Sequence, residues 1–179
     1  MDADALLRGA RKGDHTALEQ LCARCHPRLC RYVYALTRSR ETAEDVAQDT
    51  LLAMLRALPD FRGHSLEKFD AWLLRIARNR VISEARRRKA VPLPEGFDPP
   101  DPAPLPGECV ERAERRERIL RALDSLDAEM REMVILRYEM ELSYAQIAAA
   151  LEISQTRVKW RLRDAREKLR GMLADESAW

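Results

Sequence analysis

A cluster of prolines constrains this chain of 179 residues more than any other feature: seven of its nine prolines fall between positions 92 and 106. Proline has no amide hydrogen to donate and disfavours a helical conformation in the residue before it, so this segment cannot form a helix. Its composition predicts an extended, acidic, proline-rich linker over residues 90–109. We therefore expect two small domains, over residues 1–89 and 110–175, instead of one continuous core.

Both flanking segments show the apolar spacing of helices. Apolar residues recur three and four positions apart, and nothing alternates with period two for long enough to make a strand. The fold class predicted is therefore all-α, with two small helical domains, and we expect Pro27 to disturb the second helix. The predicted helices cover residues 3–11, 15–37, 41–57, 67–88, 110–124, 128–138, 143–150 and 154–173.

Charge is segregated along the chain, although the formal net charge is only +2. Residues 75–89 hold seven basic side chains and one acidic one, and residues 154–170 hold seven basic and two acidic ones. Between them, residues 90–109 hold four acidic side chains and no basic one. Two basic patches on either side of an acidic segment indicate two separate contacts with a polyanion such as a nucleic acid.

The residue groupings of common enzymes are missing from the sequence. The three histidines, His15, His26 and His64, are scattered, and no Gly-rich phosphate loop or Ser-His-Asp arrangement is evident. The first residues lack the apolar run of a signal peptide, and no apolar stretch is long enough to cross a bilayer. We expect a cytoplasmic protein that is not an enzyme and does not insert into a membrane.

Residues 143–170 carry the pattern of a helix-turn-helix. Ser143 followed by Gln146 predicts a capping box at the start of a short helix, and Ser154 is placed to cap a longer, basic helix. An outward Trp160 would pack on a sugar or a thymine methyl group; the alternative is that it lies against a neighbouring helix or the other domain. The predicted DNA contacts on this helix are Gln155, Thr156, Arg157, Lys159, Trp160, Arg163 and Arg166.

Several runs in the chain resemble one known family. Residues 142–148 (LSYAQIA) and 158–170 (VKWRLRDAREKLR) resemble region 4 of bacterial sigma factors. Residues 43–50 (AEDVAQDT) resemble region 2.2, and residues 69–79 together with 86–88 resemble regions 2.3 and 2.4. Only these two domains are present, so the chain is similar to the extracytoplasmic-function (ECF, group 4) sigma factors of the sigma-70 family.

This resemblance implies a function and a set of partners. The chain would bind core RNA polymerase, at the β′ clamp and the β flap, and guide it to promoter DNA. The second domain would read the −35 element as duplex, and the first would capture the −10 element as melted single strand. An anti-sigma factor that clamps both domains is also implied.

The resemblance also implies residue roles in the first domain. The predicted polymerase contacts lie on the acidic helix and are Asp45, Gln48, Asp49 and Leu52. The predicted −10 contacts are Ser65, Trp72, Arg75, Arg78, Asn79, Arg80, Arg86 and Arg87. Here Asn79 would lie near a pocket for a flipped base, and the arginines would hold phosphates. Without the resemblance, the acidic residues of this helix would be explained by the helix dipole, which favours acids in the first turn, and Asn79 would be an ordinary surface amide.

Two positions depart from the family pattern. Glu152 stands in the helix-turn-helix turn where the family often has glycine, and a positive φ there would cost up to about 1 kcal/mol. Asp164 stands where the family often has arginine. The −35 sequence cannot therefore be transferred from a relative.

Four residues with soft ligand atoms, Cys22, Cys25, His26 and Cys30, lie close together in the second predicted helix. Cys22 to His26 matches the haem attachment pattern C-x-x-C-H, but that use needs an exported chain and an open loop, and neither is predicted. We expect these residues to pack in the core, with no metal and no cofactor, because Cys22, Cys25 and His26 share an apolar side of the helix. Zinc binding or a redox switch is the alternative.

Two other functional classes compete with the sigma factor. A stand-alone helix-turn-helix regulator would need a dimerisation surface or a ligand pocket, whereas here the other domain carries its own basic helix. A metal or redox protein would rely on the cysteine cluster.

Overall fold

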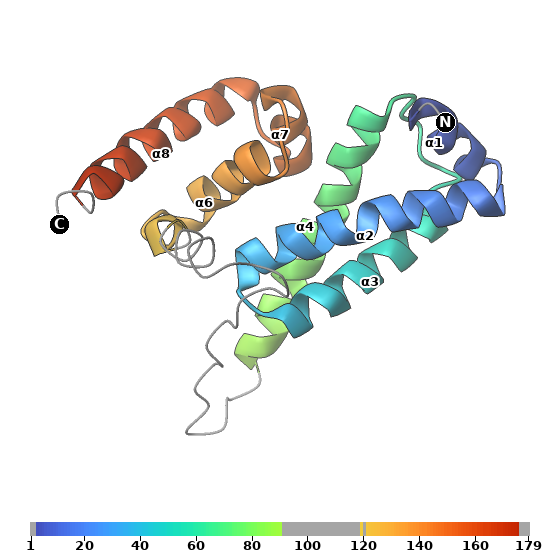
Figure 1. The fold of residues 1–179 in the computed structure, drawn as a ribbon, viewed down its shortest axis with the longest axis horizontal. Coiled ribbons are helices and arrows are strands. Elements are labelled where there is room, and N and C mark those ends of the chain that lie inside the picture. Colours follow the sequence, from blue (N-terminus) through green and yellow to red (C-terminus); the bar gives the residue numbers. More distant parts are fainter. Residues whose placement is uncertain (1–2, 91–118, 120, 176–179) are drawn as a thin grey trace.

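The computed structural model describes residues 3–90, 119 and 121–175, and its regular elements are all helices (Figure 1). The all-α class is therefore confirmed. The linker predicted for residues 90–109 lies outside the described residues except for Ala90, which ends a helix, and so does most of the helix predicted for 110–124. The elements are α1 (Ala3–Arg11), α2 (His15–Thr37), α3 (Arg40–Ala57), α4 (Leu66–Ala90), α6 (Ala128–Val134), the π-helix η1 (Ile135–Glu139), α7 (Tyr144–Leu151) and α8 (Gln155–Asp175).

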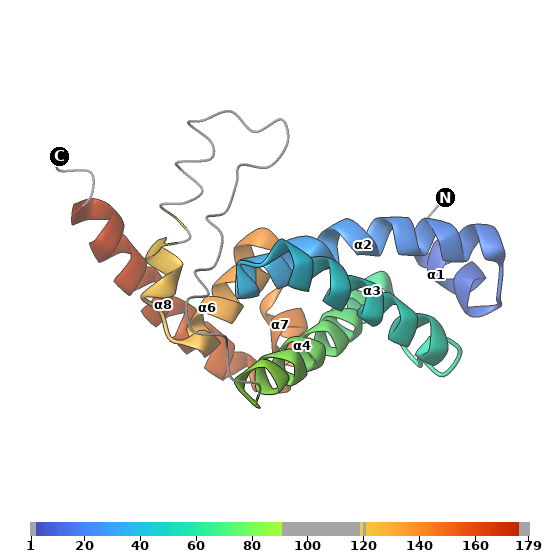
Figure 2. The same ribbon diagram turned by 90° about the horizontal axis from the view of Figure 1, so that it is seen from below.

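Helices α1 to α4 form the first unit, in which α2 and α3 run antiparallel to each other (Figures 1 and 2). Asp14 and Ser39 cap α2 and α3, because their side-chain oxygens accept hydrogen bonds from the backbone N–H groups of Ala17 and Thr42, each at 3.2 Å. Large buried side chains such as Tyr32 and Phe69 fill the space between the helices.

Pro27 lies inside α2, on its exposed side, and α2 is continuous from His15 to Thr37. The disturbance expected at this position therefore does not interrupt the helix. A proline in mid-helix removes one backbone hydrogen bond, and here the packing of α2 against α1, α3 and α4 maintains the helix on both sides of it.

Elements α6, η1, α7 and α8 form the second unit, and its helix-turn-helix follows its sequence pattern. Ser143 Oγ accepts from the Gln146 N–H at 3.3 Å, and Gln146 Oε1 accepts from the Ser143 N–H at 2.8 Å, which completes the capping box. Ser154 Oγ accepts from the Arg157 N–H at 3.2 Å, at the start of α8. The inner face of α8, with Val158 and Leu162, is fully buried.

The helix predicted over residues 128–138 is α-helical only as far as Val134 and continues as the wider turns of η1. The Met140 N–H donates to the Ile135 carbonyl at 3.1 Å, and the Leu142 N–H donates to the Leu136 carbonyl at 3.0 Å. Arg137 also donates to the Leu142 carbonyl, at 2.8 Å. These bonds widen the end of the helix and lead the chain into α7, a tertiary effect that the apolar spacing does not encode.

Glu152, which stands where the family often has glycine, has a positive φ of 57°. Its backbone N–H donates to the Ala148 carbonyl and so ends α7. A left-handed conformation crowds the Cβ of any residue other than glycine, so the turn carries strain.

Replacing Glu152 with glycine should therefore stabilise the protein. Glu152→Gly is expected to raise the free energy of unfolding by about 1 kcal/mol relative to Glu152→Ala, because both variants lose the glutamate side chain and only glycine relieves the strain. Urea unfolding followed by circular dichroism measures the difference. Equal stability of the two variants would contradict a strained turn.

Candidate nucleic-acid interface

Helix α8 presents a basic outer face at the edge of the molecule (Figure 1). Trp160 is 56% exposed, and the Arg163 guanidinium lies 5.5 Å from the centre of its ring. In the structure Trp160 therefore does not pack against another helix, which was the alternative interpretation. The predicted contacts on α8 are all exposed: Gln155, Thr156, Arg157, Lys159, Trp160, Arg163 and Arg166.

Ion pairs on the inner side of this face fix α8 on α6. Arg161 reaches Asp127 and Glu129, both at 3.0 Å, and Arg157 reaches Glu129 at 2.8 Å. Burial acts to raise the pKa of Glu129, but hydrogen bonds from Arg157 and Arg161 outweigh it and hold that pKa below its ordinary value. At α7, Arg166 donates to the Tyr144 hydroxyl at 2.6 Å.

The exposed face of α3 combines acidic and apolar side chains. The predicted contacts Asp45, Gln48, Asp49 and Leu52 are all exposed and follow each other at helical spacing. Leu52 is 52% exposed, and Leu55 one turn further on is 36% exposed, so apolar surface extends beyond the predicted set. Sequence reasoning missed Leu55, although the same spacing would have included it.

Helix α4 carries the second basic patch, but only part of it faces solvent. Phe61 and Phe69 enclose Trp72, with ring centroids 4.8 and 5.7 Å from its own, and this aromatic cluster fixes the start of α4. Of the predicted −10 contacts, Asn79, Arg86 and Arg87 are exposed, and Ser65, Trp72, Arg75, Arg78 and Arg80 are half-buried.

Two of these arginines pair within the first unit. Arg80 contacts Asp49 of α3 at 3.2 Å, and Arg87 contacts Glu84 at 2.9 Å. Both pairs are largely exposed, so they leave the guanidinium groups available to phosphates at little cost.

Two further arginines of this set pair with the second unit. Arg75 donates to Glu152 at 3.0 Å, and the Arg78 Nε–H donates to both carboxylate oxygens of Glu132, at 2.9 and 3.0 Å. The buried Tyr32 hydroxyl donates to the same carboxylate at 2.7 Å. We refer to Tyr32, Arg78 and Glu132 as the Glu132 network.

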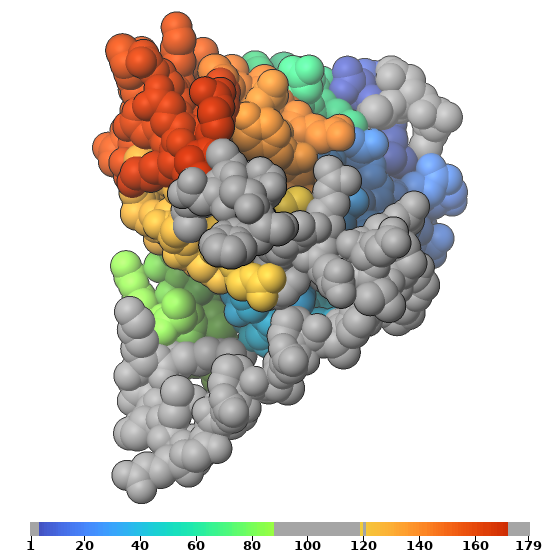
Figure 3. Space-filling model, turned by 60° about the vertical axis from the view of Figure 1, so that its left-hand side comes forward, coloured from blue at the N-terminus to red at the C-terminus, as the bar shows by residue number. Residues whose placement is uncertain are grey.

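The Glu132 network joins the two units, because Tyr32 and Arg78 belong to the first and Glu132 to the second. In the space-filling view of Figure 3 the second unit, yellow to red, lies directly against the first, blue to green. Burial and the neighbouring Glu132 carboxylate raise the pKa of Tyr32, so its hydroxyl keeps its proton and donates. At the other end of the contact, Gln146 of α7 donates to the Glu67 carbonyl of α4 at 3.5 Å. In this closed arrangement Arg75 and Arg78 are paired with carboxylates of the second unit, and their side chains are 41% and 32% exposed.

Sequence reasoning did not single out Glu132 and Tyr32, which join the two units. A signal was present, because Glu132 directly precedes the apolar run of residues 133–136 within a predicted helix. A glutamate among apolar positions usually has a buried partner.

The four soft ligands of α2 are not brought together as one set. Cys25 is 2% exposed and packs in the core as predicted, and burial raises its pKa to about 12. Cys22, His26 and Cys30 are half-buried, and His26 and Cys30 face Glu44 of α3. Burial, followed by the Glu44 charge, raises the pKa of Cys30 to about 11. Thiols that hold their protons at neutral pH are poor redox sensors, which argues against the redox alternative.

Among the described helices, none is both long and apolar enough to span a bilayer.

Comparisons with known proteins place both units in sequence families. Residues 21–91 match Sigma-70 region 2, and residues 122–171 match Sigma-70, region 4. The RNA polymerase sigma factor NccH of Alcaligenes xylosoxydans xylosoxydans is 32% identical, over 95% of this chain and 94% of its own length. The ECF RNA polymerase sigma factor SigE of Mycolicibacterium smegmatis is 31% identical, over 93% of this chain and 66% of SigE. Among solved structures, this chain is similar to CnrH in the structure of CnrH in complex with the cytosolic domain of CnrY. The two chains are 28% identical, the match covers 97% of each, and the TM-score is 0.73.

The Glu132 network should be a main contributor to stability. Glu132→Ala leaves a buried hydroxyl and a half-buried guanidinium without their acceptor and should lower the free energy of unfolding by about 3 kcal/mol. Tyr32→Phe keeps the Arg78 pair and should cost only about 1 kcal/mol. Chemical denaturation of both variants measures the difference. If Glu132→Ala costs no more than Tyr32→Phe, the ion pair adds nothing to the fold.

Proposed function

The chain belongs to the extracytoplasmic-function sigma factors of the sigma-70 family, and from this premise we infer how its surfaces are used. It is an RNA polymerase sigma factor that acts in transcription initiation. We propose that it works by binding alone, in the cytoplasm, without a catalytic step of its own. The observation that carries the residue assignments is the outer face of α8, where every predicted contact is exposed.

Helix α8 is proposed to read the −35 element in the major groove. Its first turn presents Gln155, Thr156 and Arg157, the positions from which recognition helices reach base edges. Lys159 and Arg163 lie further along the exposed face and suit phosphates or guanine edges. The ion pairs of Arg161 with Asp127 and Glu129 hold the opposite side of α8 on α6, so this face points to solvent.

Helix α3 is proposed to dock on core polymerase at the β′ clamp, with the second unit at the β flap. An exposed leucine within an acidic face suits a basic partner with an apolar groove, because burial of Leu52 provides affinity and the acids provide orientation.

The −10 surface of α4 is proposed to become complete only when the two units separate. The −10 and −35 elements lie roughly 25 base pairs apart, which is roughly 85 Å of duplex. In the closed arrangement the helix-turn-helix touches α4 directly, so the two surfaces cannot reach both elements together. Separation would release Arg75 and Arg78 for the melted strand, whose preferential binding would drive promoter opening.

An anti-sigma factor is the proposed regulator of this separation. CnrH, which this chain resembles over nearly its full length, was solved with the cytosolic domain of CnrY. A protein that binds both units in their closed arrangement would keep Arg75 and Arg78 paired with Glu152 and Glu132 and would therefore prevent promoter recognition.

The purified protein mixed with core RNA polymerase and passed over a sizing column tests the function directly. We expect comigration at one copy per polymerase. Absence of binding to polymerase, together with tight binding of duplex DNA by the protein alone as a dimer, would favour the stand-alone regulator instead.

Leu52→Ala should weaken binding to core polymerase about tenfold, the loss typical of a buried apolar anchor. Fluorescence anisotropy of the labelled protein with core polymerase gives the Kd. Glu19→Ala, an exposed acid on α2, serves as the control and should bind as wild type. Unchanged affinity of Leu52→Ala would exclude the α3 face as the docking surface.

Two α8 variants should separate phosphate contacts from base contacts. With the polymerase-bound protein on promoter DNA, Lys159→Ala should weaken binding to all sequences and lower the slope of log K against log salt by about 1. Gln155→Ala should keep that slope and relax the base preference at a single position of the −35 element. The same behaviour in both variants would contradict these roles.

A further inference from the structure

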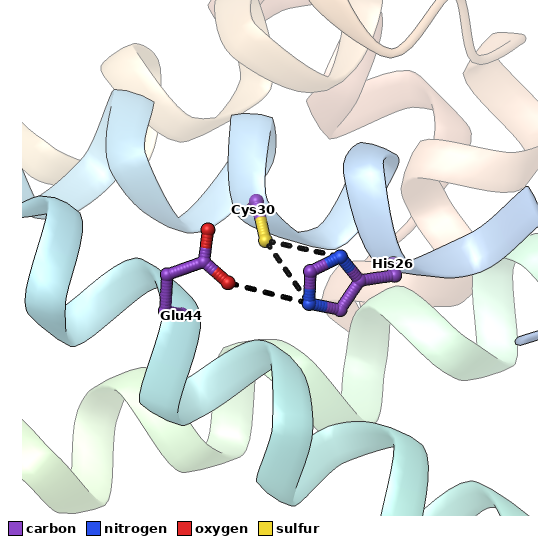
Figure 4. Close-up of side chains that lie close together, drawn as sticks. All are labelled: His26, Cys30 and Glu44. Atoms are coloured by element: carbon purple, nitrogen blue, oxygen red, sulfur yellow. Dashed lines mark hydrogen bonds and ion pairs between the residues drawn. The ribbon is translucent and has the colours of Figure 1, made fainter. Parts of the chain in front are cut away.

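Three potential metal ligands meet between α2 and α3 at a place that none of the proposed functions uses (Figure 4). His26 and Cys30 are one helical turn apart on α2 and point toward Glu44 of α3. One ligand atom from each residue lies within 4.8 Å of the others, and the described residues contain no second group of this kind.

The distances between these atoms fit a tetrahedral ion. His26 Nε2 lies 3.7 Å from Cys30 Sγ and 3.3 Å from Glu44 Oε2. A tetrahedral zinc with bonds of about 2.3 Å to sulfur and about 2.0 Å to nitrogen and oxygen separates sulfur from nitrogen by about 3.5 Å, and nitrogen from oxygen by about 3.3 Å. Two of the three separations are thus already those of a bound ion.

The third separation, between sulfur and carboxylate, can close by side-chain rotation alone. The Glu44 side chain is 56% exposed and the His26 side chain 38% exposed. A rotation of these side chains disturbs no core packing. Their exposure also gives an ion a path to the site and leaves a fourth position for water.

The chemistry of the donors selects the metal. A thiolate, an imidazole and one carboxylate are the ligands that zinc takes in proteins, whereas magnesium and calcium need mainly oxygen ligands. An ordinary ion pair between His26 and Glu44 would account for only two of the three residues, whereas a metal ion would use all three.

We propose that His26, Cys30 and Glu44 form a Zn²⁺ site that links α2 to α3. On binding, the zinc ion replaces the proton of the Cys30 thiol, which passes to solvent, and the imidazole binds through Nε2. The site differs from the four-residue cluster suggested by the sequence, because Cys25 is in the core and Glu44 comes from another helix. Glu44 directly precedes Asp45, so bound zinc would also fix the start of the face proposed to dock on polymerase.

Titration of the metal-free, reduced full-length protein with Zn²⁺ against a chromophoric chelator tests the site. We expect one ion per chain, and Cys30→Ser and His26→Ala should each weaken binding by more than about tenfold, since even loss of a residue that only supports a ligand costs that much. Cys22→Ser is the matched control, a half-buried cysteine two turns away on the same helix, and should bind as wild type.

Co²⁺ as a spectroscopic substitute identifies the ligands even where a variant is less stable. The wild-type protein and Cys22→Ser should show thiolate-to-cobalt charge-transfer absorption in the near ultraviolet. Cys30→Ser should lose it, and Glu44→Gln should keep it with weaker binding. No binding by the wild type, retention of the band in Cys30→Ser, or its loss in Cys22→Ser would each overturn the proposal.

Discussion

The arrangement of the two units depends on the burial of the Glu132 carboxylate, which is only 7% exposed. An ionised carboxylate removed from water is costly unless hydrogen bonds replace its hydration. Tyr32 of α2 and Arg78 of α4 supply those bonds, so the carboxylate of α6 is satisfied only while all three helices stay together. This requirement fixes the position of the helix-turn-helix on α4, and with it the pairing of Arg75 with Glu152.

A polar contact of this kind suits a protein that must change its arrangement. Arg78 and Glu132 have alternative partners in water or nucleic acid once the units part, whereas the apolar part of the contact, where buried side chains of both units form one cluster, has none. Binding of polymerase or DNA to the open form has to supply only the difference in free energy between the open and closed forms. An anti-sigma factor would act in the opposite direction, by adding contacts that exist only in the closed form.

Local features of the fold were predictable from the sequence, and contacts between distant segments were not. Ser143, Gln146 and Ser154 predict the helix-turn-helix, because helix capping is a hydrogen bond between residues three positions apart. By contrast, Tyr32 and Glu132 are 100 positions apart, and Glu44 meets His26 only because α2 and α3 pack side by side. The spacing of residues along the sequence does not reveal such pairs. Glu132 was therefore not identified, and the metal ligands proposed around His26 were all taken from one helix.

The distance between the units, free and bound to core polymerase, tests the account most directly. Fluorescence energy transfer between dyes attached through unnatural amino acids at exposed positions 19 of α2 and 168 of α8 avoids the native cysteines. The account predicts high transfer in the free protein, a marked loss on addition of core polymerase, and low transfer without polymerase in Glu132→Ala. Unchanged high transfer in a holoenzyme that still opens promoters would contradict it, because Arg75 and Arg78 would then remain paired with the second unit.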